Sequence, residues 1–304
     1  MSQQPRTTVV VVTWRGRDHI VDCLNALTEQ TRPLWTVVVD NASDDGTAAL
    51  LAGHPMAGTI LRLDENVGYA GALESALSIV DTPYVAWLND DAAPEPKWLA
   101  ALESALDADP KAAAASSRLI TENGVVQSLG VRLTADGHGA DRTEVGEPFG
   151  FCGGAALMRT EVLRAVGGIP GDFFCYYEDT DTSWRMRLAG WRVVSVPSAV
   201  VWHRHGASSE PGSPKFHRWN ERNRLLMLLR CAPAWVAGWQ LVRFVLITLK
   251  LLVRRNPSGA ANFRVGLRLG VLGEVLRRLP ATLRERRGVN GNRKVLWRDW
   301  AGRG

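Results

Sequence analysis

Short apolar runs alternate with longer helical stretches over residues 7–91. The apolar runs are rich in valine and too short for helices, so they predict buried strands, and the stretches between them predict helices. The strands are expected at residues 9–13, 37–40, 59–63 and 84–88, and the helices at 17–30, 46–52 and 69–80. Because the runs show no in/out alternation, we predict an α/β fold with a mostly parallel sheet covered on both faces.

The pattern changes twice beyond residue 91. Residues 112–158 predict shorter strands and glycine-rich turns, residues 178–189 predict a helix, and residues 191–196 and 199–202 predict two closing strands. A hinge of proline, glycine and serine follows at residues 211–214 and marks a domain boundary. We therefore predict one domain over residues 1–210 and a helical region over residues 211–304.

The two predicted parts carry charges of opposite sign. Residues 1–210 hold 16 Lys and Arg against 27 Asp and Glu, whereas residues 211–304 hold 20 against 4. An acidic first part needs a metal ion to handle phosphate groups, and a basic second part suits a membrane, a nucleic acid or a phosphorylated lipid. Four scattered cysteines and an N-terminus without a signal-peptide pattern favour the cytosol.

Two segments of the basic region are amphipathic. Arg243 and Lys250 interrupt residues 234–253, so the uncharged stretch falls far short of the roughly 20 residues that a membrane span needs. In the first segment, the polar residues Gln240, Arg243, Lys250 and Arg254 fall close to one face of the helix, and the large apolar residues, among them Trp235, Trp239 and Phe244, lie around the rest. In the second segment, residues 263–279, the polar residues on one side are Arg264, Arg268, Glu274 and Arg278. We interpret both as helices lying peripherally on the cytoplasmic side of a membrane, with their apolar residues inserted. The alternative is that they cover the first domain and that their arginines are a solvated face.

Polar residues at the predicted strand ends are the candidates for nucleotide binding. The sequence contains no glycine-rich phosphate loop of the dehydrogenase or P-loop type, and ligands gather at the carboxyl ends of parallel strands. Thr13 and Arg15 follow the first strand and Asp40 ends the second. Asp40 can accept a base N–H, and the other two can reach base and phosphate.

Carboxylates also follow the fourth strand, at Asn89, Asp90 and Asp91. Magnesium typically uses one or two carboxylates together with substrate phosphates, so a nucleotide diphosphate and a cation fit this edge. Adjacent side chains of an extended segment point opposite ways, so only one of the two aspartates is expected to face the phosphates. His203, at the end of the last strand, can complete the coordination.

A second acidic cluster starts the helix predicted at residues 178–189. Glu178, Asp179 and Asp181 lie within four residues of one another. The helix dipole favours acids at this end and explains part of the cluster. Crowding raises the pKa of at least one carboxyl, which suits a general base.

These motifs, in this order, resemble the family 2 inverting glycosyltransferases of the GT-A fold. Among them the sequence looks most like the bacterial rhamnosyltransferases that extend polyprenyl-diphosphate-linked sugars. The resemblance covers roughly residues 7–230 and rests on Thr13 and Arg15, Val39-Asp40-Asn41-Ala42-Ser43, Asn66-Val67-Gly68-Tyr69-Ala70-Gly71, Leu88-Asn89-Asp90-Asp91, Gly153-Gly154-Ala155, Tyr177-Glu178-Asp179, Trp184-Arg185, Ala189-Gly190-Trp191 and Trp202-His203.

The resemblance implies a Rossmann-like, mostly parallel sheet and a role for each site residue. It gives the base and ribose to Thr13, Arg15 and Asp40, the donor to Asn66 and Gly68, the metal to Asp91, and the general base to Asp179 with Glu178 beside it. Asn89 and Asp90 belong to the same donor edge, His203 falls where some relatives place a metal ligand, and Arg222 with Asn223 falls where many carry an Arg-Asn pair near the donor diphosphate. The sequence departs from the family at Asn89, where many members have Asp, and at residues 72–74, which replace glycines and an asparagine.

We therefore expect a metal-dependent inverting glycosyltransferase that uses Mg²⁺ or Mn²⁺. The resemblance favours transfer of L-rhamnose from dTDP-rhamnose to a polyprenyl-diphosphate-linked GlcNAc acceptor, in cell-wall or surface polysaccharide assembly. A UDP-sugar donor is the alternative, followed by a sugar nucleotidyltransferase. A nucleic-acid partner is not expected, because the apolar helices of the basic region argue against a nucleic-acid binder.

Overall fold

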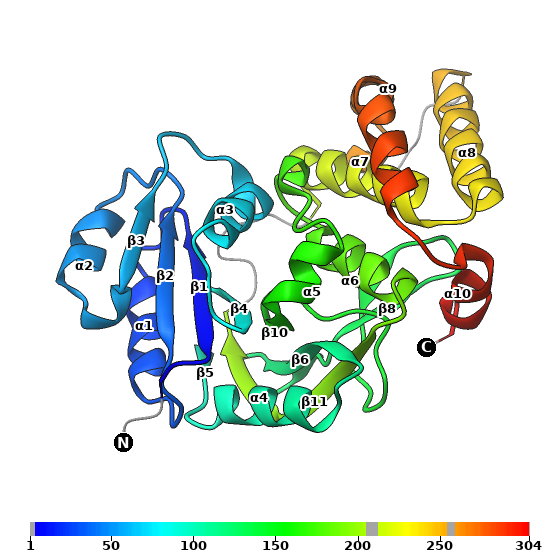
Figure 1. Ribbon diagram of the computed structural model, residues 1–304. Coiled ribbons are helices and arrows are strands. Elements are labelled where there is room, and N and C mark those ends of the chain that lie inside the picture. The colour runs from blue at the N-terminus through cyan, green and yellow to red at the C-terminus, as the bar shows by residue number, and fades with distance from the viewer. Residues whose placement is uncertain (1–3, 205–211, 254–258, 304) are drawn as a thin grey trace.

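The computed structural model describes residues 4–204, 212–253 and 259–303. Within them, nine strands form one sheet in the order β3-β2-β1-β4-β10-β6-β11-β5, with β7 paired to β6, and β8 and β9 form a separate hairpin (Figure 1). The strands are β1 (Thr7–Thr13), β2 (Trp35–Asp40), β3 (Thr59–Arg62), β4 (Tyr84–Asn89), β5 (Ala92–Pro94), β6 (Ala112–Ile120), β7 (Val126–Ser128), β8 (Val131–Leu133), β9 (Gly139–Asp141), β10 (Ala155–Arg159) and β11 (Arg192–His203). The helices are α1 (Ile20–Thr28), α2 (Thr47–Gly53), α3 (Gly68–Leu77), α4 (Trp98–Ala108), α5 (Thr160–Ala165), α6 (Glu178–Leu188), α7 (Pro214–Cys231), α8 (Ala234–Val253), α9 (Val265–Gly288) and α10 (Arg293–Trp300).

The first half of the sheet is parallel, as the sequence predicts. β1 pairs in parallel with β2 and β4, and β2 with β3. Val10 and Val12 contribute to one hydrophobic core, while Val9 and Val11 contribute to a second core. Successive side chains of a strand point to opposite faces, so an uninterrupted valine run supplies both cores. The second half is mixed, because β10 is antiparallel to β4 and to β6.

Two strand predictions are corrected by the structure. The strand expected at residues 59–63 is β3, but its side chains are mostly exposed because it forms the edge of the sheet and pairs only with β2 among the described strands. The two closing strands are one strand, β11, whose pairing with β6 shifts register between Val196 and Val200. A bulge of this kind bends a strand without ending it.

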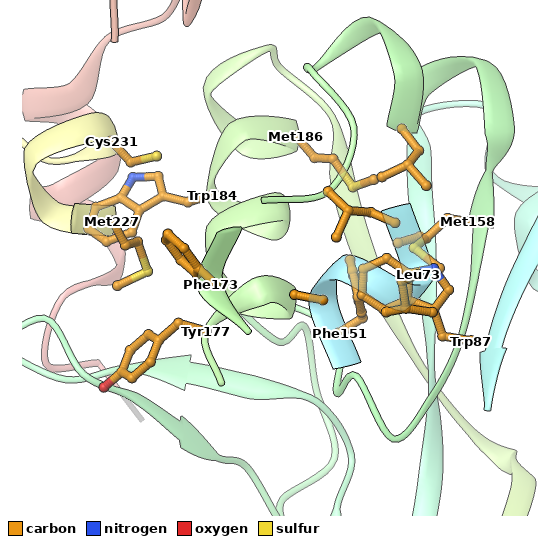
Figure 2. Close-up of a cluster of buried hydrophobic side chains, with 14 of the residues drawn as sticks. Leu73, Trp87, Phe151, Met158, Phe173, Tyr177, Trp184, Met186, Met227 and Cys231 are labelled. Atoms are coloured by element: carbon orange, nitrogen blue, oxygen red, sulfur yellow. The ribbon is translucent and has the colours of Figure 1, made fainter. Parts of the chain in front are cut away.

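The predicted domain boundary, between residues 210 and 211, lies outside the described residues. The serine and proline that follow it start α7: the Ser213 hydroxyl accepts a hydrogen bond from Phe216 N, and Pro214 occupies the first turn. Further along α7, Met227 and Cys231 pack beside Trp184 of α6 (Figure 2). The hydrophobic core therefore continues from the sheet into the helical region.

Candidate active site

Parallel pairing brings the predicted strand ends to one edge of the sheet. Thr13 lies opposite Asp40, and Val12 lies opposite Asn89. Leu88 lies opposite Ala155 of β10, and Asn89 N donates to Gly154 O at 2.9 Å. The Gly153-Gly154 motif therefore lies beside the Asn89-Asp90-Asp91 motif, although more than sixty residues separate them in the chain.

The residues expected to bind the nucleotide differ in their burial and in the partners of their side chains. Asp40 is buried, and its carboxylate accepts from Ser43 N at 2.9 Å and pairs with Arg62. The Arg15 side chain is half-exposed and pairs with Asp44 at 2.7 Å. The Thr13 hydroxyl is buried and has no hydrogen-bond partner in the described part of the chain. Their roles in nucleotide binding stay predictions.

Asn41 organises the turn that carries Asn66 and Gly68. Its side-chain Nδ2 donates to Asn66 Oδ1 at 3.0 Å, and its side-chain Oδ1 accepts from Val67 N at 3.0 Å. Gly68 has φ +80°, and a Cβ there would lie 2.3 Å from Phe174 O. Glycine is required at this position by both the backbone conformation and the close approach of the chain.

Asp91 and His203 come together as a buried pair. His203 Nε2 lies 3.1 Å from Asp91 Oδ1 and 3.1 Å from Asn89 Nδ2, while His203 Nδ1 lies 2.9 Å from Gln127 Oε1. When Nδ1 donates its proton to Gln127 Oε1, the Nε2 lone pair is left for a cation shared with Asp91. A second contact that fixes the tautomer in this way is typical of histidines that bind metals. A cavity of about 310 Å³ opens beside this pair.

The side chains of Asp91 and His203 suit a cation whose other ligands come from a substrate. The described residues contain no cluster of three or more His, Cys, Asp or Glu suited to a metal. One carboxylate and one imidazole nevertheless suffice where phosphate oxygens supply the other ligands. Asp90 is directed elsewhere and lies 3.3 Å from His19 Nε2, and this contact raises the pKa of His19.

Glu178 and Asp179 begin α6 in contrasting surroundings. Asp179 Oδ2 accepts from Gly153 N at 2.9 Å, and its Oδ1 accepts from the Thr180 hydroxyl at 2.9 Å. Tyr69 donates to Gly153 O at 2.9 Å, which ties α3 to the same glycine. Glu178 is buried, and its Oε2 has no hydrogen-bond partner among the described residues.

These surroundings raise the pKa of both acids. Burial, and then the charge of Asp179, raise the pKa of Glu178 to about 8. Burial also raises the pKa of Asp179, although hydrogen bonds from Gly153 and Thr180 oppose the rise. Glu178 therefore keeps its proton at neutral pH, whereas the hydrogen bonds from Gly153 and Thr180 favour the charged form of Asp179.

Arg222 lies on α7, and its guanidinium contacts other groups of the protein. Its guanidinium donates to Asn223 Oδ1 at 2.8 Å, to Glu274 Oε2 at 2.9 Å and to Phe173 O at 2.5 Å. Contact with a donor diphosphate stays a prediction.

The sequence did not point to Gln127, Arg62 or Tyr69 as site residues. Gln127 lies on the short strand β7, and no motif surrounds it. Arg62 reaches Asp40 from an edge strand with an ordinary strand pattern. Of these three residues, only Tyr69 lies within a motif that the sequence identified, so only Tyr69 could have been predicted as a site residue.

Solved structures of glycosyltransferases share this fold. The mannosyltransferase PcManGT from Pyrobaculum calidifontis, in complex with GDP-Man and Mn²⁺, is 23% identical with a TM-score of 0.57, over 95% of this chain and 86% of that one. S. aureus TarS 1–349 is 17% identical with a TM-score of 0.58, over 91% of this chain and 82% of that one. The fold is thus that of the GT-A glycosyltransferases.

The sequence places the chain more narrowly. Residues 8–167 match glycosyl transferase family 2, and the chain belongs to this family. An N-acetylglucosaminyl-diphospho-decaprenol L-rhamnosyltransferase of Mycobacterium tuberculosis is 28% identical over 244 residues, which cover 69% of this chain and 79% of the relative. The galactofuranosyltransferase GlfT1 of the same organism is 40% identical over 87 residues, 27% of this chain and 29% of the relative. The family and fold expected from the motifs are confirmed.

The raised pKa of Glu178 makes stability depend on pH. The pKa rises from an ordinary 4.5 to about 8 on folding, so between these values unfolding releases a proton. We expect Glu178 to lower the free energy of unfolding progressively as pH rises through this window, and Glu178→Gln to remove that contribution. Urea denaturation at several pH values in the window measures it.

Glu161→Gln, in the exposed first turn of α5, is the control and should keep the wild-type dependence on pH. An equal pH dependence in the wild-type and Glu178→Gln proteins would contradict the assignment.

Proposed function

We propose that the protein is a metal-dependent inverting glycosyltransferase that acts on a polyprenyl-diphosphate-linked GlcNAc acceptor. The observation that carries the proposal is the acid pair at the start of α6: Glu178 is buried, and Asp179 accepts a hydrogen bond from Gly153 beside the carboxyl ends of the sheet. The acceptor follows from the relative of M. tuberculosis, whose name specifies a decaprenol-linked N-acetylglucosamine. The product would serve cell-wall or surface polysaccharide assembly.

L-rhamnose from dTDP-rhamnose is the donor that we favour. The same relative is an L-rhamnosyltransferase, which supports this choice. TarS was solved with UDP-GlcNAc and PcManGT with GDP-Man, so the fold accommodates other bases and sugars. A UDP-sugar is the alternative donor, and release of UDP rather than dTDP in a donor screen would identify it.

Asp179 is the proposed general base. It would remove the proton of the acceptor hydroxyl as that oxygen attacks the anomeric carbon in line, so no covalent enzyme intermediate forms. Glu178 stays protonated beside it at neutral pH and does not compete for the proton. Asp91 and His203 would hold the cation, which when bound neutralises the charge that builds on the departing diphosphate.

The role of Asp179 predicts the behaviour of Asp179→Asn. We expect transfer to be abolished while donor affinity stays within a few-fold, because the amide keeps the shape of the side chain and loses its basicity. Sugar transfer and donor titration measure the two effects.

Asparagine offers one acceptor oxygen where Asp179 uses two, so the thermal midpoint of the variant must be compared with that of wild type. Glu178→Gln is measured beside Asp179→Asn, because Glu178 Oε2 has no hydrogen-bond partner among the described residues. Turnover above roughly a tenth of wild type in a folded Asp179→Asn protein would exclude Asp179 as the base, and Glu178 would replace it.

The metal pair predicts a second outcome. Chelation by EDTA should stop transfer, and Mg²⁺ or Mn²⁺ should restore it. Asp91→Ala should weaken both cation and donor binding, measured by calorimetry, while Asp90→Ala should affect them less because Asp90 faces His19. Undiminished activity in EDTA would remove the metal from the proposal.

Helices α8 and α9 stand beside each other at the end of the molecule away from α2 (Figure 1). Two of their polar residues turn toward the protein: Gln240 accepts from Arg224 at 3.3 Å, and Arg268 is buried and donates to Phe244 O at 2.9 Å. Lys250 and Arg277 are exposed instead. Phe244 itself is only 3% exposed, so the expectation that it inserts into a membrane is wrong. Arg254 lies outside the described residues.

The outward faces of these helices combine large apolar side chains with charged ones. The large exposed apolar side chains are Trp235, Trp239, Val242, Leu246, Leu249, Leu252 and Val253 on α8, and Leu269, Leu276 and Leu283 on α9. The exposed charged side chains include Arg243 and Lys250 on α8 and Arg277 and Arg284 on α9. Helix α8 is also the one helix in the described ranges that is long and apolar enough to cross a membrane. Arg243 nevertheless pairs with Asp136 at 2.7 Å, which fixes α8 to the first part of the chain. We propose that both helices lie in the membrane interface on the cytoplasmic side, with the apolar faces inserted.

Membrane binding can be tested with two tryptophans. Trp235 and Trp239 are 63% and 57% exposed, so replacing both by Ser should weaken binding to anionic vesicles by at least about tenfold, because a buried large apolar side chain contributes about 1.5–3 kcal/mol. Vesicle sedimentation measures the affinity. Trp35, 59% exposed on β2, is the matched control, and Trp35→Ser should bind as wild type does. Failure of the wild-type protein to sediment with vesicles would contradict the membrane proposal.

A further inference from the structure

The turn that leads into the acid pair has an unfavourable backbone. Phe174, Tyr176 and Tyr177 have φ values of +65°, +72° and +71°, in the left-handed region that side chains other than glycine rarely adopt. Each such residue costs on the order of 1–3 kcal/mol and persists only where its surroundings hold it. Glu178 and Asp179 follow directly, so whatever holds this turn also places the two acids.

Asn223 of α7 holds the turn. Its side chain is fully buried, and its Nδ2 lies 3.0 Å from Phe173 O, 2.8 Å from Cys175 O and 2.8 Å from Tyr176 O. Two N–H hydrogens thus serve three carbonyl groups of one turn. An amide nitrogen is a donor only, so it is suited to carbonyl oxygens that converge on one point.

Arg222 and Glu274 fix the orientation of this amide. Arg222 Nε donates to Asn223 Oδ1 at 2.8 Å, so the oxygen end of the amide is occupied and the nitrogen end must face the turn. Arg222 is held in turn by Glu274 of α9 at 2.9 Å. A charged group thereby assigns the two ends of a neutral side chain.

The same turn also contacts the segment expected to bind the donor. Phe174 O accepts from Ala70 N at 3.0 Å, and Gly68 leaves room for that carbonyl group. A shift of the turn would therefore move the acid pair and the start of α3 relative to each other. Displacements of about 1 Å between reacting groups can cost about 100-fold in rate.

We propose that Asn223, oriented by Arg222 and Glu274, is a positioning residue that holds the strained turn and so sets the place of the acid pair. It acts through the backbone at residues 173–176 and touches neither acid side chain in the bonds described. The proposal rests on the proposed function, because it assigns Asn223 to the sugar-transfer step. It also gives the Arg-Asn pair a role different from the contact with the donor diphosphate that the resemblance implies.

The test compares two substitutions on the same helix. Asn223→Asp keeps the size of the side chain and directs a carboxylate oxygen at the three carbonyl groups. Asn220→Asp makes the same change of charge at a side chain that donates to Phe216 O within α7. Hydrogen exchange of the amides of residues 172–180, and kcat and KM for donor and acceptor, are measured for both variants and wild type.

For Asn223→Asp we expect exchange at residues 172–180 to accelerate at least about tenfold and kcat to fall about 100-fold, with the donor KM within a few-fold of wild type. Asn220→Asp should match wild type in both. If Asn223→Asp does not fold, Arg222→Lys replaces it: lysine keeps the charge beside Glu274 but lacks the second donor that orients the amide, so the same changes should occur with smaller size.

Unchanged exchange at residues 172–180 would overturn the holding role. Faster exchange with unchanged kcat, or an equal loss of kcat and of donor binding, would overturn the positioning role. A wild-type protein that transfers no sugar from any nucleotide donor would overturn the proposed function instead, and the exchange comparison would still decide whether Asn223 holds the turn.

Discussion

The burial of helix α6 is the constraint on which the rest of the structure depends. Every residue of this helix except Asp179 is buried, although it contains three acids and two arginines. A buried charge is costly unless it is paired. Asp181 is fully buried and accepts from Arg185 at 2.7 Å and from Arg230 at 2.8 Å. Glu178 has no such partner among the described residues and remains protonated instead.

This pairing explains why the C-terminal helices are part of the structure that surrounds the candidate active site. Arg230 of α7 bridges Asp181 to Glu285 of α9, and Asn223, also on α7, holds the turn before α6. Both helices thus complete the environment of the acid pair. Helix α9 also carries part of the exposed apolar surface that we propose for membrane contact, so the proposed contact and the placement of the acids share this helix.

Charge counting gave an incomplete picture of the basic region. Several of its arginines are buried and used inside the protein, where they neutralise carboxylates or cap carbonyl groups: Arg222, Arg224, Arg230 and Arg268. The surface that we propose for membrane contact is defined by exposed tryptophan and leucine side chains as much as by cations. Net charge describes what a chain carries, whereas folding decides which of those charges solvent can reach.

The sequence by itself determined the parallel half of the sheet, the family, and the acids and amides at the strand ends. These features can be predicted because valine runs and local motifs consist of residues that are adjacent in the chain. It did not determine the partners of His203 or the support of the turn before Glu178. Gln127 stands 76 residues away from His203 and has no motif of its own. Asn223 stands 45 residues away from Glu178, and the Arg-Asn pair to which it belongs indicated the donor diphosphate, not the turn. Only the tertiary structure could assign them, because a side-chain amide acquires its role from the carbonyl groups and imidazole that long-range packing brings within hydrogen-bond distance.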